Sequence, residues 1–272
     1  MIAVVAGASG GIGRSVVSKL LVREFIVFAW VKNKVGEVTL LEYLANANVR
    51  VNNLYIICAD FCDVTQIYTG ADEMAQILSS RAFKKNPKID VFINCSGCFY
   101  SVHPKTGKDL NFQINFEAPI LLIKELEKFA SIDARAVFLM PNFNSNLRHF
   151  QLSNLSGAKR SYLTSKLLLL NALKNEIKKG EVFNIYFYCA KPTNTSFYIK
   201  NVTGAMEYLG VIRKAFSLPP EFSAEQVVLL ATRPEYDGES GCLYYDLKPV
   251  PMPKVVYSKK FLAKANKFAH QF

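Results

Sequence analysis

A tyrosine and a lysine stand four residues apart within a stretch that predicts a helix, Tyr162 and Lys166. Residues at i and i+4 share one helix face, so this spacing places an ammonium group beside a phenol. A phenol has an ordinary pKa of about 10 and must lose and regain a proton to reduce a carbonyl. A neighbouring cation favours the phenolate and moves that pKa towards working pH. Taken alone, however, such a pair is common in ordinary amphipathic helices, and a purely structural role for Tyr162 and Lys166 is then the better interpretation.

A glycine-rich turn follows the first apolar run and precedes a helical pattern. Glycines allow a tight turn and let a pyrophosphate approach the backbone, and the helix start offers free N–H groups and its positive dipole end to the anion. In this strand–turn–helix context the turn predicts dinucleotide binding, whereas a glycine-rich loop alone is weak evidence. The residues expected to contact the cofactor here are Gly7, Ser9, Gly10, Gly11, Ile12 and Gly13.

The elements that must position these residues alternate almost to the end of the chain. Strands are expected at residues 2–6, 25–31, 54–58, 89–94, 136–140, 183–189 and 242–245. Helices are expected at residues 12–22, 37–47, 71–81, 110–129, 161–179 and 223–232. Several strands are continuously apolar, as expected where helices cover both faces of a sheet. The alternation predicts an α/β fold, a doubly wound sheet of about seven mostly parallel strands.

No composition shift divides the chain, so we expect one domain over residues 1–246 and a tail over residues 247–272. The tail reads as a basic amphipathic helix that docks on its own domain or on a neighbour rather than on a membrane. Helices 110–129 and 161–179 carry apolar residues on more than one face. Because a helix on a sheet buries one stripe, this extra area predicts a homodimer or homotetramer.

Composition excludes several classes of protein. Of 272 residues, 50% are hydrophobic, and no uncharged apolar stretch is long enough to span a membrane. Glycines and Arg14 interrupt the apolar start, so we expect no secretory signal and a cytoplasmic protein. The net charge of +11 is spread in pairs such as Lys178-Lys179, which favours a basic surface suited to an anionic cofactor or substrate over a nucleic-acid partner.

The six cysteines suggest neither a redox pair nor a metal site. Cys95 and Cys98 have redox-motif spacing, but they follow a strand instead of opening a helix near the N-terminus. Cys58 and Cys62 have no histidine nearby in the sequence. We therefore expect buried free thiols and no metal.

Taken together, the glycine-rich turn and Tyr-x-x-x-Lys, in this order, resemble the signature of the short-chain dehydrogenase/reductase family. The spacing of Gly7 and Gly11 fits its classical branch, and the resemblance covers essentially residues 1–246. It implies a Rossmann-type domain, a nicotinamide dinucleotide, and a catalytic role for Tyr162 and Lys166, which would also contact the cofactor.

Further residues match the family at the ends of the expected strands. Asn94-Cys95-Ser96-Gly97 resembles its Asn-Asn-Ala-Gly segment, so the resemblance implies cofactor contacts at Asn94, Ser96 and Gly97. The same reasoning assigns the adenine side to Asp60 and Phe61, the catalytic asparagine that supports a relay water to Asn115, and the carboxamide side to Pro192 and Thr195. The resemblance also makes residues 195–220, which are aromatic and apolar, a substrate lid that suits a hydrophobic carbonyl, although they could equally pack on the core.

One family component is missing. The catalytic serine sits just past the fifth strand, but here that strand runs into Pro141 and Asn142, and His149 stands at the usual spacing before Tyr162. Asn142 is our candidate replacement, with Ser145 and Ser153 as alternatives; equally, the site could be weakened.

The end of the second strand bears on cofactor choice. NAD enzymes place an acid there for the ribose 2′-OH. This chain has Lys32, and no acid precedes Glu37. Lys32 would neutralise a 2′-phosphate, which predicts NADP(H) over NAD(H), unless it is a surface lysine without a ligand. The expected function is NADPH-dependent reduction of a ketone or aldehyde; the rival is a non-catalytic dinucleotide-binding sensor or assembly protein.

Overall fold

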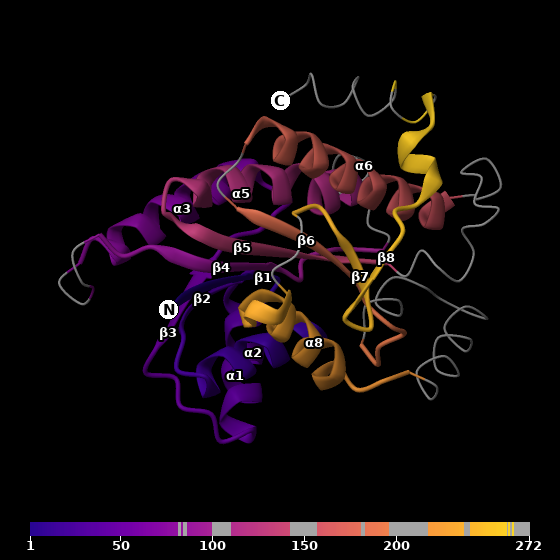
Figure 1. The fold of residues 1–272 in the computed structure, drawn as a ribbon. Helices are drawn as coiled ribbons and strands as arrows, with labels where there is room; N and C mark the ends of the chain where they lie inside the picture. Colours follow the sequence, from indigo (N-terminus) through magenta and orange to yellow (C-terminus); the bar gives the residue numbers. More distant parts are fainter. Residues whose placement is uncertain are drawn as a thin grey trace.

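A computed structural model describes residues 1–80, 83, 86–99, 110–141, 157–180, 183–195, 217–236, 240–259, 261 and 263, with only the backbone for 157–160. Its strands form one sheet in the order β3-β2-β1-β4-β5-β6-β7-β8 (Figure 1). Their bounds are β1 Ile2–Ala6, β2 Ile26–Val31, β3 Leu54–Cys58, β4 Ile89–Asn94, β5 Ala130–Met140, β6 Asn184–Cys189, β7 Leu243–Tyr245 and β8 Lys248–Val250. All neighbours pair in parallel except β7 and β8.

This arrangement confirms the expected α/β fold with a doubly wound, mostly parallel sheet. The additional strand, β8, pairs antiparallel with β7 across a tight turn at Asp246 and Leu247. Both turn residues have positive φ, 54° and 58°, as hairpin turns require. The sheet thus continues past residue 246, where the sequence pattern suggested that it ends.

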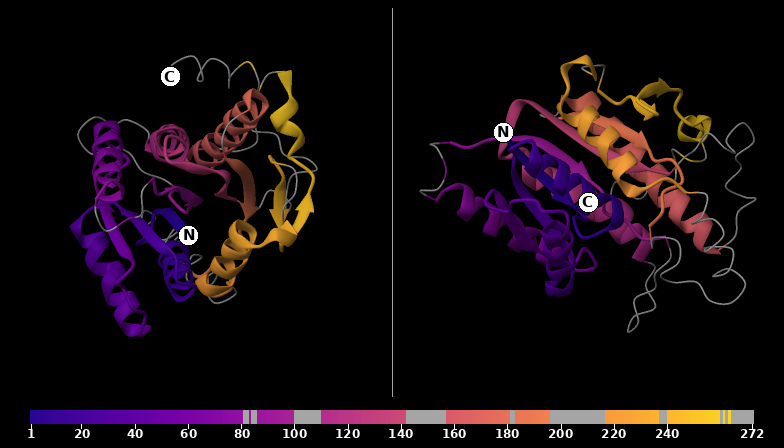
Figure 2. Two further views of the ribbon diagram at one scale, coloured as in Figure 1. Left: turned by 60° about the vertical axis from the view of Figure 1, so that its left-hand side comes forward. Right: turned by 90° about the horizontal axis from the view of Figure 1, so that it is seen from below.

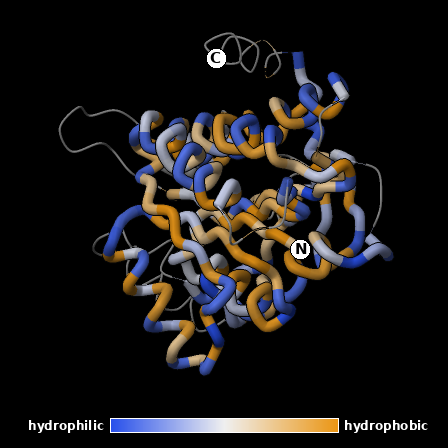
Figure 3. The backbone as a smooth tube through the Cα atoms, turned by 90° about the vertical axis from the view of Figure 1, so that its left-hand side faces the viewer, coloured by the Kyte–Doolittle hydropathy of each residue, from blue (hydrophilic) through white to orange (hydrophobic). Residues whose placement is uncertain are grey.

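Helices cover both faces of the sheet (Figures 1 and 2). One layer contains α1 Gly11–Val22, α2 Lys34–Asn46 and α8 Pro220–Thr232. The other contains α3 Val64–Leu78, α4 Leu110–Phe112, the π-helical turn η1 Gln113–Glu117, α5 Ala118–Glu127 and α6 Gly157–Lys179. Val4 and Val5 of β1 face opposite layers and are both fully buried. This two-sided burial explains the continuous apolar runs, visible as orange strands inside Figure 3.

Side-chain caps set two helix starts earlier than the hydrophobic pattern suggested. Asn33 Oδ1 accepts a hydrogen bond from Gly36 N at 3.1 Å, so α2 begins at Lys34. Asp63 Oδ1 accepts from Thr65 N at 3.0 Å, so α3 begins at Val64 rather than near residue 71. Such caps satisfy N–H groups that the first helical turn leaves free.

The single helix expected over residues 110–129 is divided by the π turn η1. Ala118 N donates to Gln113 O, five residues back instead of four. Pro119, in the first turn of α5, has no N–H for the carbonyl of Asn115. The α-helical ladder is therefore broken at Asn115, a residue expected to be catalytic.

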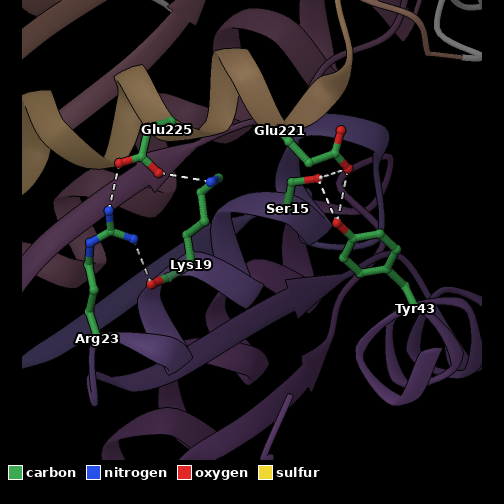
Figure 4. Close-up of polar contacts among 6 residues, drawn as sticks. All are labelled: Ser15, Lys19, Arg23, Tyr43, Glu221 and Glu225. Atoms are coloured by element: carbon green, nitrogen blue, oxygen red, sulfur yellow. Dashed lines mark hydrogen bonds and ion pairs between the residues drawn. The ribbon is translucent and has the colours of Figure 1, made fainter. Parts of the chain in front are cut away.

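Polar contacts fix α8 to the opposite end of the chain (Figure 4). Glu221 Oε1 accepts from Ser15 Oγ at 3.2 Å and from Tyr43 Oη at 3.1 Å. One turn further on, Glu225 pairs with Lys19 at 2.8 Å and Arg23 at 2.6 Å. The Lys19 hydrogen bond is the main cause that lowers the pKa of Glu225. These contacts join α8 to the helix that opens at the glycine-rich turn.

The apolar surface of α6 is covered within the chain. Leu168 and Leu169 are 1% and 0% exposed, and they share a core cluster with Val256 and Phe261 of the C-terminal segment. Lys174 of α6 also donates to Tyr257 Oη at 3.1 Å. The uncovered area that motivated a homodimer or homotetramer is therefore absent from the described part of α6, and that assembly stays a prediction. Within the same described residues, no helix combines the length and apolarity needed to cross a bilayer.

Replacing Leu168 by alanine should lower the free energy of unfolding by about 2–5 kcal/mol, because it leaves a cavity in the core of one chain. Because this core lies within one chain, the stability lost through Leu168→Ala should be the same at every protein concentration, whether or not the chain assembles through another face. Ile132→Ala, at a side chain 89% exposed, is the matched control and should change stability by less than about 0.5 kcal/mol. A loss that changes with concentration would instead indicate that a second copy covers the face.

Candidate active site

The site begins where the strand order reverses, between β1 and β4. Ligands bind beyond the carboxyl ends of strands at such a switch point. Gly7, directly after β1, has a φ of +72°, and a Cβ there would lie 2.8 Å from the backbone N and Cα of Ser96 after β4. Only glycine permits this approach, so the two loops lie side by side.

The other glycines keep the start of α1 open. A Cβ on Gly13 would lie 2.1 Å from Gly7 O, and Gly10 N donates to the same carbonyl at 3.0 Å. Gly10 caps α1 without a side-chain hydrogen bond, and the first turn has no acid. Thr195 lies against this turn, since a Cβ on Gly11 would meet its Cγ2 at 2.5 Å. The arrangement suits an anion.

At the ends of β2 and β3, two expected cofactor residues contact each other. Lys32 Nζ lies 3.4 Å from Asp60 Oδ2, with side chains 62% and 30% exposed. An exposed pair of this kind contributes little and can exchange partners. Ser9 lies beside the first turn of α2, where a Cβ on Gly36 would be 3.0 Å from Ser9 Oγ.

Phe61, expected on the adenine side, is mainly a core residue. Its ring is 8% exposed and packs against Trp30 with centroids 6.4 Å apart. Asp60 is held by its own loop, where Oδ1 accepts from Cys62 N at 3.0 Å. The Gln113 side chain donates to Cys62 O, which links this loop to the π turn.

The end of β4 carries a buried donor without a partner among the described residues. Asn94 is 1% exposed, and its Oδ1 accepts from Ser96 N at 3.1 Å and Ser96 Oγ at 2.5 Å. Its Nδ2 meets no acceptor there. Gly97 follows in the same loop.

The expected acid–base pair lies on α6 and faces this loop. Tyr162 is 6% and Lys166 2% exposed, and Lys166 Nζ donates to Ser96 O at 3.3 Å. Burial lowers the pKa of Lys166 to about 8, and the nearby Cys98 and Cys95 thiols oppose this more weakly. The structure thus brings Lys166 to the loop after β4, which lies beside the glycine-rich turn.

Asn115 joins the same group through its side chain. Its Nδ2 donates to Cys98 O at 2.8 Å, and its Oδ1 accepts from Cys98 N at 2.9 Å. Nδ2 also lies 3.2 Å from Ser165 Oγ, and that hydroxyl donates to Tyr162 O at 2.7 Å. Because Pro119 cannot donate to the Asn115 carbonyl, that oxygen lacks its α-helical partner, as a water-binding role would require.

Backbone hydrogen bonds join the segment after β6 to the residue just before α8, at the two ends of the expected lid. Leu218 N donates to Pro192 O at 2.9 Å, and Asn194 N donates to Leu218 O at 2.8 Å. The two ends of the expected lid are therefore joined by backbone hydrogen bonds, with Pro192 and Asn194 at one end and Leu218 at the other. Helix α8 begins at Pro220, at the end of the expected lid.

Several expectations fall outside the described residues. Asn142, Ser145, Ser153 and most of the lid are among them. The sequence analysis did not predict that Ser165 contacts Asn115, that Gln113 bonds to the loop at Cys62, or that Pro119 interrupts the helix. Of these, only the helix interruption could have been predicted, because a proline within a helical pattern removes a hydrogen bond.

All six cysteines are free thiols, as expected, but only Cys189 is fully buried and Cys58 is exposed. Cys58 ends β3, which is an edge strand of the sheet that the described residues form. Burial raises the pKa of Cys95 to about 12, so this thiol is poorly suited to redox chemistry.

Comparison with known proteins agrees with this geometry. A family model described as short chain dehydrogenase matches residues 1–138. The chain belongs to the short-chain dehydrogenase family. The match ends before Tyr162, so α6 is related to known proteins by structure. No match is found among curated protein sequences.

Solved structures share the fold over 90% of this chain. A dehydrogenase/reductase from Sinorhizobium meliloti 1021 is 19% identical, with a TM-score of 0.65 and 92% of its own chain covered. Salutaridine reductase from Papaver somniferum is 16% identical, with a TM-score of 0.62 and 99% covered. A variant of actinorhodin polyketide ketoreductase with NADPH is 17% identical, with a TM-score of 0.64 and 95% covered. Family and fold together make this chain an oxidoreductase of the nicotinamide-dinucleotide-binding kind.

The residues present fit such a dinucleotide. A Cβ at Gly7 or Gly13 would fill the space at the glycine-rich turn, and the first turn of α1 has no side-chain cap. Asn94 Nδ2 is a buried donor that finds no acceptor among the described residues. These features stand along one edge of the sheet, from Lys32 at the end of β2 to Lys166 beside the β4 loop.

Lys166→Met should raise the free energy of unfolding, because it removes a buried ammonium group. The gain should be largest below pH 8, where folded and unfolded chains both hold the proton, and could reach the order of 3 kcal/mol. It should shrink as pH rises from 8 towards 10.5, since the folded protein releases the proton first. Urea unfolding across this range tests it, with exposed Lys178→Met as control. A gain independent of pH would contradict the burial argument.

Proposed function

We propose that this chain is an NADPH-dependent reductase of a ketone or aldehyde, with Tyr162 as proton donor. The observation that carries the proposal is the buried Lys166 ammonium group, one helical turn from Tyr162 and bonded to Ser96 O at 3.3 Å. A lysine held in this way costs stability, which a purely structural helix would not require. Its position supports a role in proton transfer.

Each group has a distinct task in this proposal. Tyr162 Oη gives its proton to the substrate carbonyl oxygen. The Lys166 ammonium stabilises the phenolate that remains and contacts the nicotinamide ribose. The Asn115 carbonyl, left without its α-helical partner by Pro119, holds the water that returns a proton towards Tyr162.

The cofactor would lie along the carboxyl edge of the sheet. When bound, it supplies the hydride; the protein supplies position and charge. The first turn of α1 would hold the pyrophosphate, and Asn94, Ser96 and Thr195 would contact the nicotinamide half. Lys32 would leave Asp60 for a 2′-phosphate, because a phosphate carries more charge than one exposed carboxylate.

A hydrophobic substrate fits the composition of residues 195–220, which are rich in aromatic and apolar side chains. The paired ends of this segment, at Pro192, Asn194 and Leu218, would hold it beside Thr195 and hence near the nicotinamide end. Asn142 remains our candidate for the hydrogen bond that the family's serine makes to the substrate oxygen.

The second candidate function is dinucleotide binding without catalysis. One observation favours it: Pro141, and no serine, follows β5, which ends at Met140. A protein of this kind would bind NADPH through the same residues and turn over no carbonyl compound.

NADPH should bind more tightly than NADH by about tenfold or more, the size of one charge-assisted contact. Trp30 is the single tryptophan; it stands two residues before Lys32 in the sequence, and its ring packs against Phe61. Quenching of its fluorescence is the readout of binding. Lys32→Asp should narrow the difference, because a carboxylate repels the 2′-phosphate. Lys248→Asp, on the edge strand β8 at the other side of the sheet, makes the same charge change and should leave the difference between the two affinities unchanged. Equal affinities in the wild type would remove the NADPH assignment.

Tyr162→Phe keeps the ring and removes the transferable proton, so carbonyl reduction should slow by about 10²–10⁴-fold. NADPH affinity should barely change. Tyr68→Phe, on the outer face of α3 and 43% exposed, is the matched control and should stay fully active. Steady-state oxidation of NADPH with a panel of carbonyl compounds gives the rates. If the wild type turns over none of them at saturating NADPH, the binding protein is the better description.

A further inference from the structure

A buried asparagine outside the family's motifs contacts the loop that carries the proton-transfer machinery. Asn111 lies on α4, one turn before Asn115, and is 0% exposed. In the amide orientation that satisfies all its polar atoms, Nδ2 donates to Cys98 O at 3.0 Å and Phe99 O at 3.1 Å. Its Oδ1 accepts from Ser161 Oγ at 3.2 Å. Asn111 therefore links the end of the β4 loop to α6.

Two of the three partners of Asn111, Ser161 and Phe99, adjoin Tyr162. Ser161 immediately precedes it, and the Phe99 ring packs against the Tyr162 ring with centroids 5.4 Å apart and planes at 57°. A change in the Phe99 backbone would move the ring against which Tyr162 rests. Asn111 itself is bonded to the residues that flank the phenol rather than to the phenol.

Asn115 makes the corresponding link on the other side of Tyr162. It bonds to Cys98 O at 2.8 Å and to Ser165, whose hydroxyl donates to Tyr162 O at 2.7 Å. The two asparagines thus share one acceptor, Cys98 O, and hold α6 at Ser161 and Ser165. A carbonyl has two lone pairs and can accept both donors.

The Asn111 contacts act on the part of the chain that follows the sheet. Cys98 and Phe99 lie beyond Asn94, the last residue of β4, and both are partly buried. Each of their carbonyls accepts a hydrogen bond from the Asn111 amide, and such bonds are directional. The Asn111 amide therefore restrains the position of the loop at Cys98 and Phe99.

We propose that Asn111 is a positioning residue: with Ser161 it holds the Phe99–Tyr162 contact so that the Tyr162 hydroxyl faces the substrate carbonyl. Its effect on rate rests on the proposed function. Its effect on the loop does not, so the two can be tested separately.

The kinetic test compares Asn111→Leu with Asn171→Leu. Asn171 is a second buried amide, 6% exposed, which bonds Asn175 near the other end of α6 and not the β4 loop. Asn111→Leu should lower kcat by about 10- to 100-fold, the size expected when a reacting group is misplaced, with the KM for NADPH unchanged. Asn171→Leu should lose stability and keep its kcat.

Conservative changes at Ser161 serve if Asn111→Leu does not fold. Ser161→Ala should lower kcat, and Ser161→Thr, which keeps the hydroxyl, should restore it. A kcat that falls equally in Asn111→Leu and Asn171→Leu, or in neither, overturns the proposal.

A readout independent of activity follows the loop itself. Alkylation of Cys98 by iodoacetamide, measured by mass spectrometry, should be faster in Asn111→Leu than in the wild type or in Asn171→Leu. Cys189, 1% exposed at the end of β6, is the internal reference. If the wild type reduces no carbonyl compound, the proposed function fails, and Cys98 labelling still decides whether Asn111 holds the loop. Equal Cys98 labelling in all three proteins overturns that role.

Discussion

The close approach of two loops at the switch point of the sheet governs this site. Gly7, in a left-handed conformation, lies so near the backbone of Ser96 that any side chain would force the loops apart. This contact joins the turn that opens α1 to the loop that follows β4. Since Ser96 O in turn accepts from Lys166, the glycine-rich turn, the loop after β4 and α6 are linked to one another.

Side chains from three helical elements hold the loop after β4. Its backbone carbonyls accept hydrogen bonds from Lys166 on α6, Asn115 on the π turn and Asn111 on α4. Buried polar networks are costly unless every member is satisfied, so they define a geometry more sharply than apolar packing does. In the proposed reaction, a site assembled in this way would need little reorganisation when charge develops at the Tyr162 oxygen.

The second half of the chain is secured by contacts with the first half and with its own end. Glu221 and Glu225 join α8 to α1 and α2, while Val256 and Phe261 complete the core on the α6 side. Val256 and Phe261 therefore belong to the core of the domain. The sequence alone did not distinguish a C-terminal segment that packs on its own chain from one that packs on a neighbour.

The sequence alone was sufficient for the features that depend on local pattern. Continuous apolar runs predicted a parallel sheet covered on both faces, and the spacing of Gly7 to Gly13 and of Tyr162 to Lys166 predicted an anion cradle and a phenol–ammonium pair. It predicted most of the elements and the family, because periodicity and motif spacing act within one or two turns of chain; the proton-transfer chemistry stays a prediction.

Only the tertiary structure decided which of these groups meet. The partner of Lys32 is Asp60, just beyond the end of another strand, and Leu168 shares one core cluster with Val256 and Phe261 of the C-terminal segment. The π turn at Gln113–Glu117 combines the missing donor of Pro119 with bonds to Cys62 and Cys98. Such contacts join residues far apart in the chain, and they are selected by packing and by the cost of unpaired buried groups. No local pattern records them.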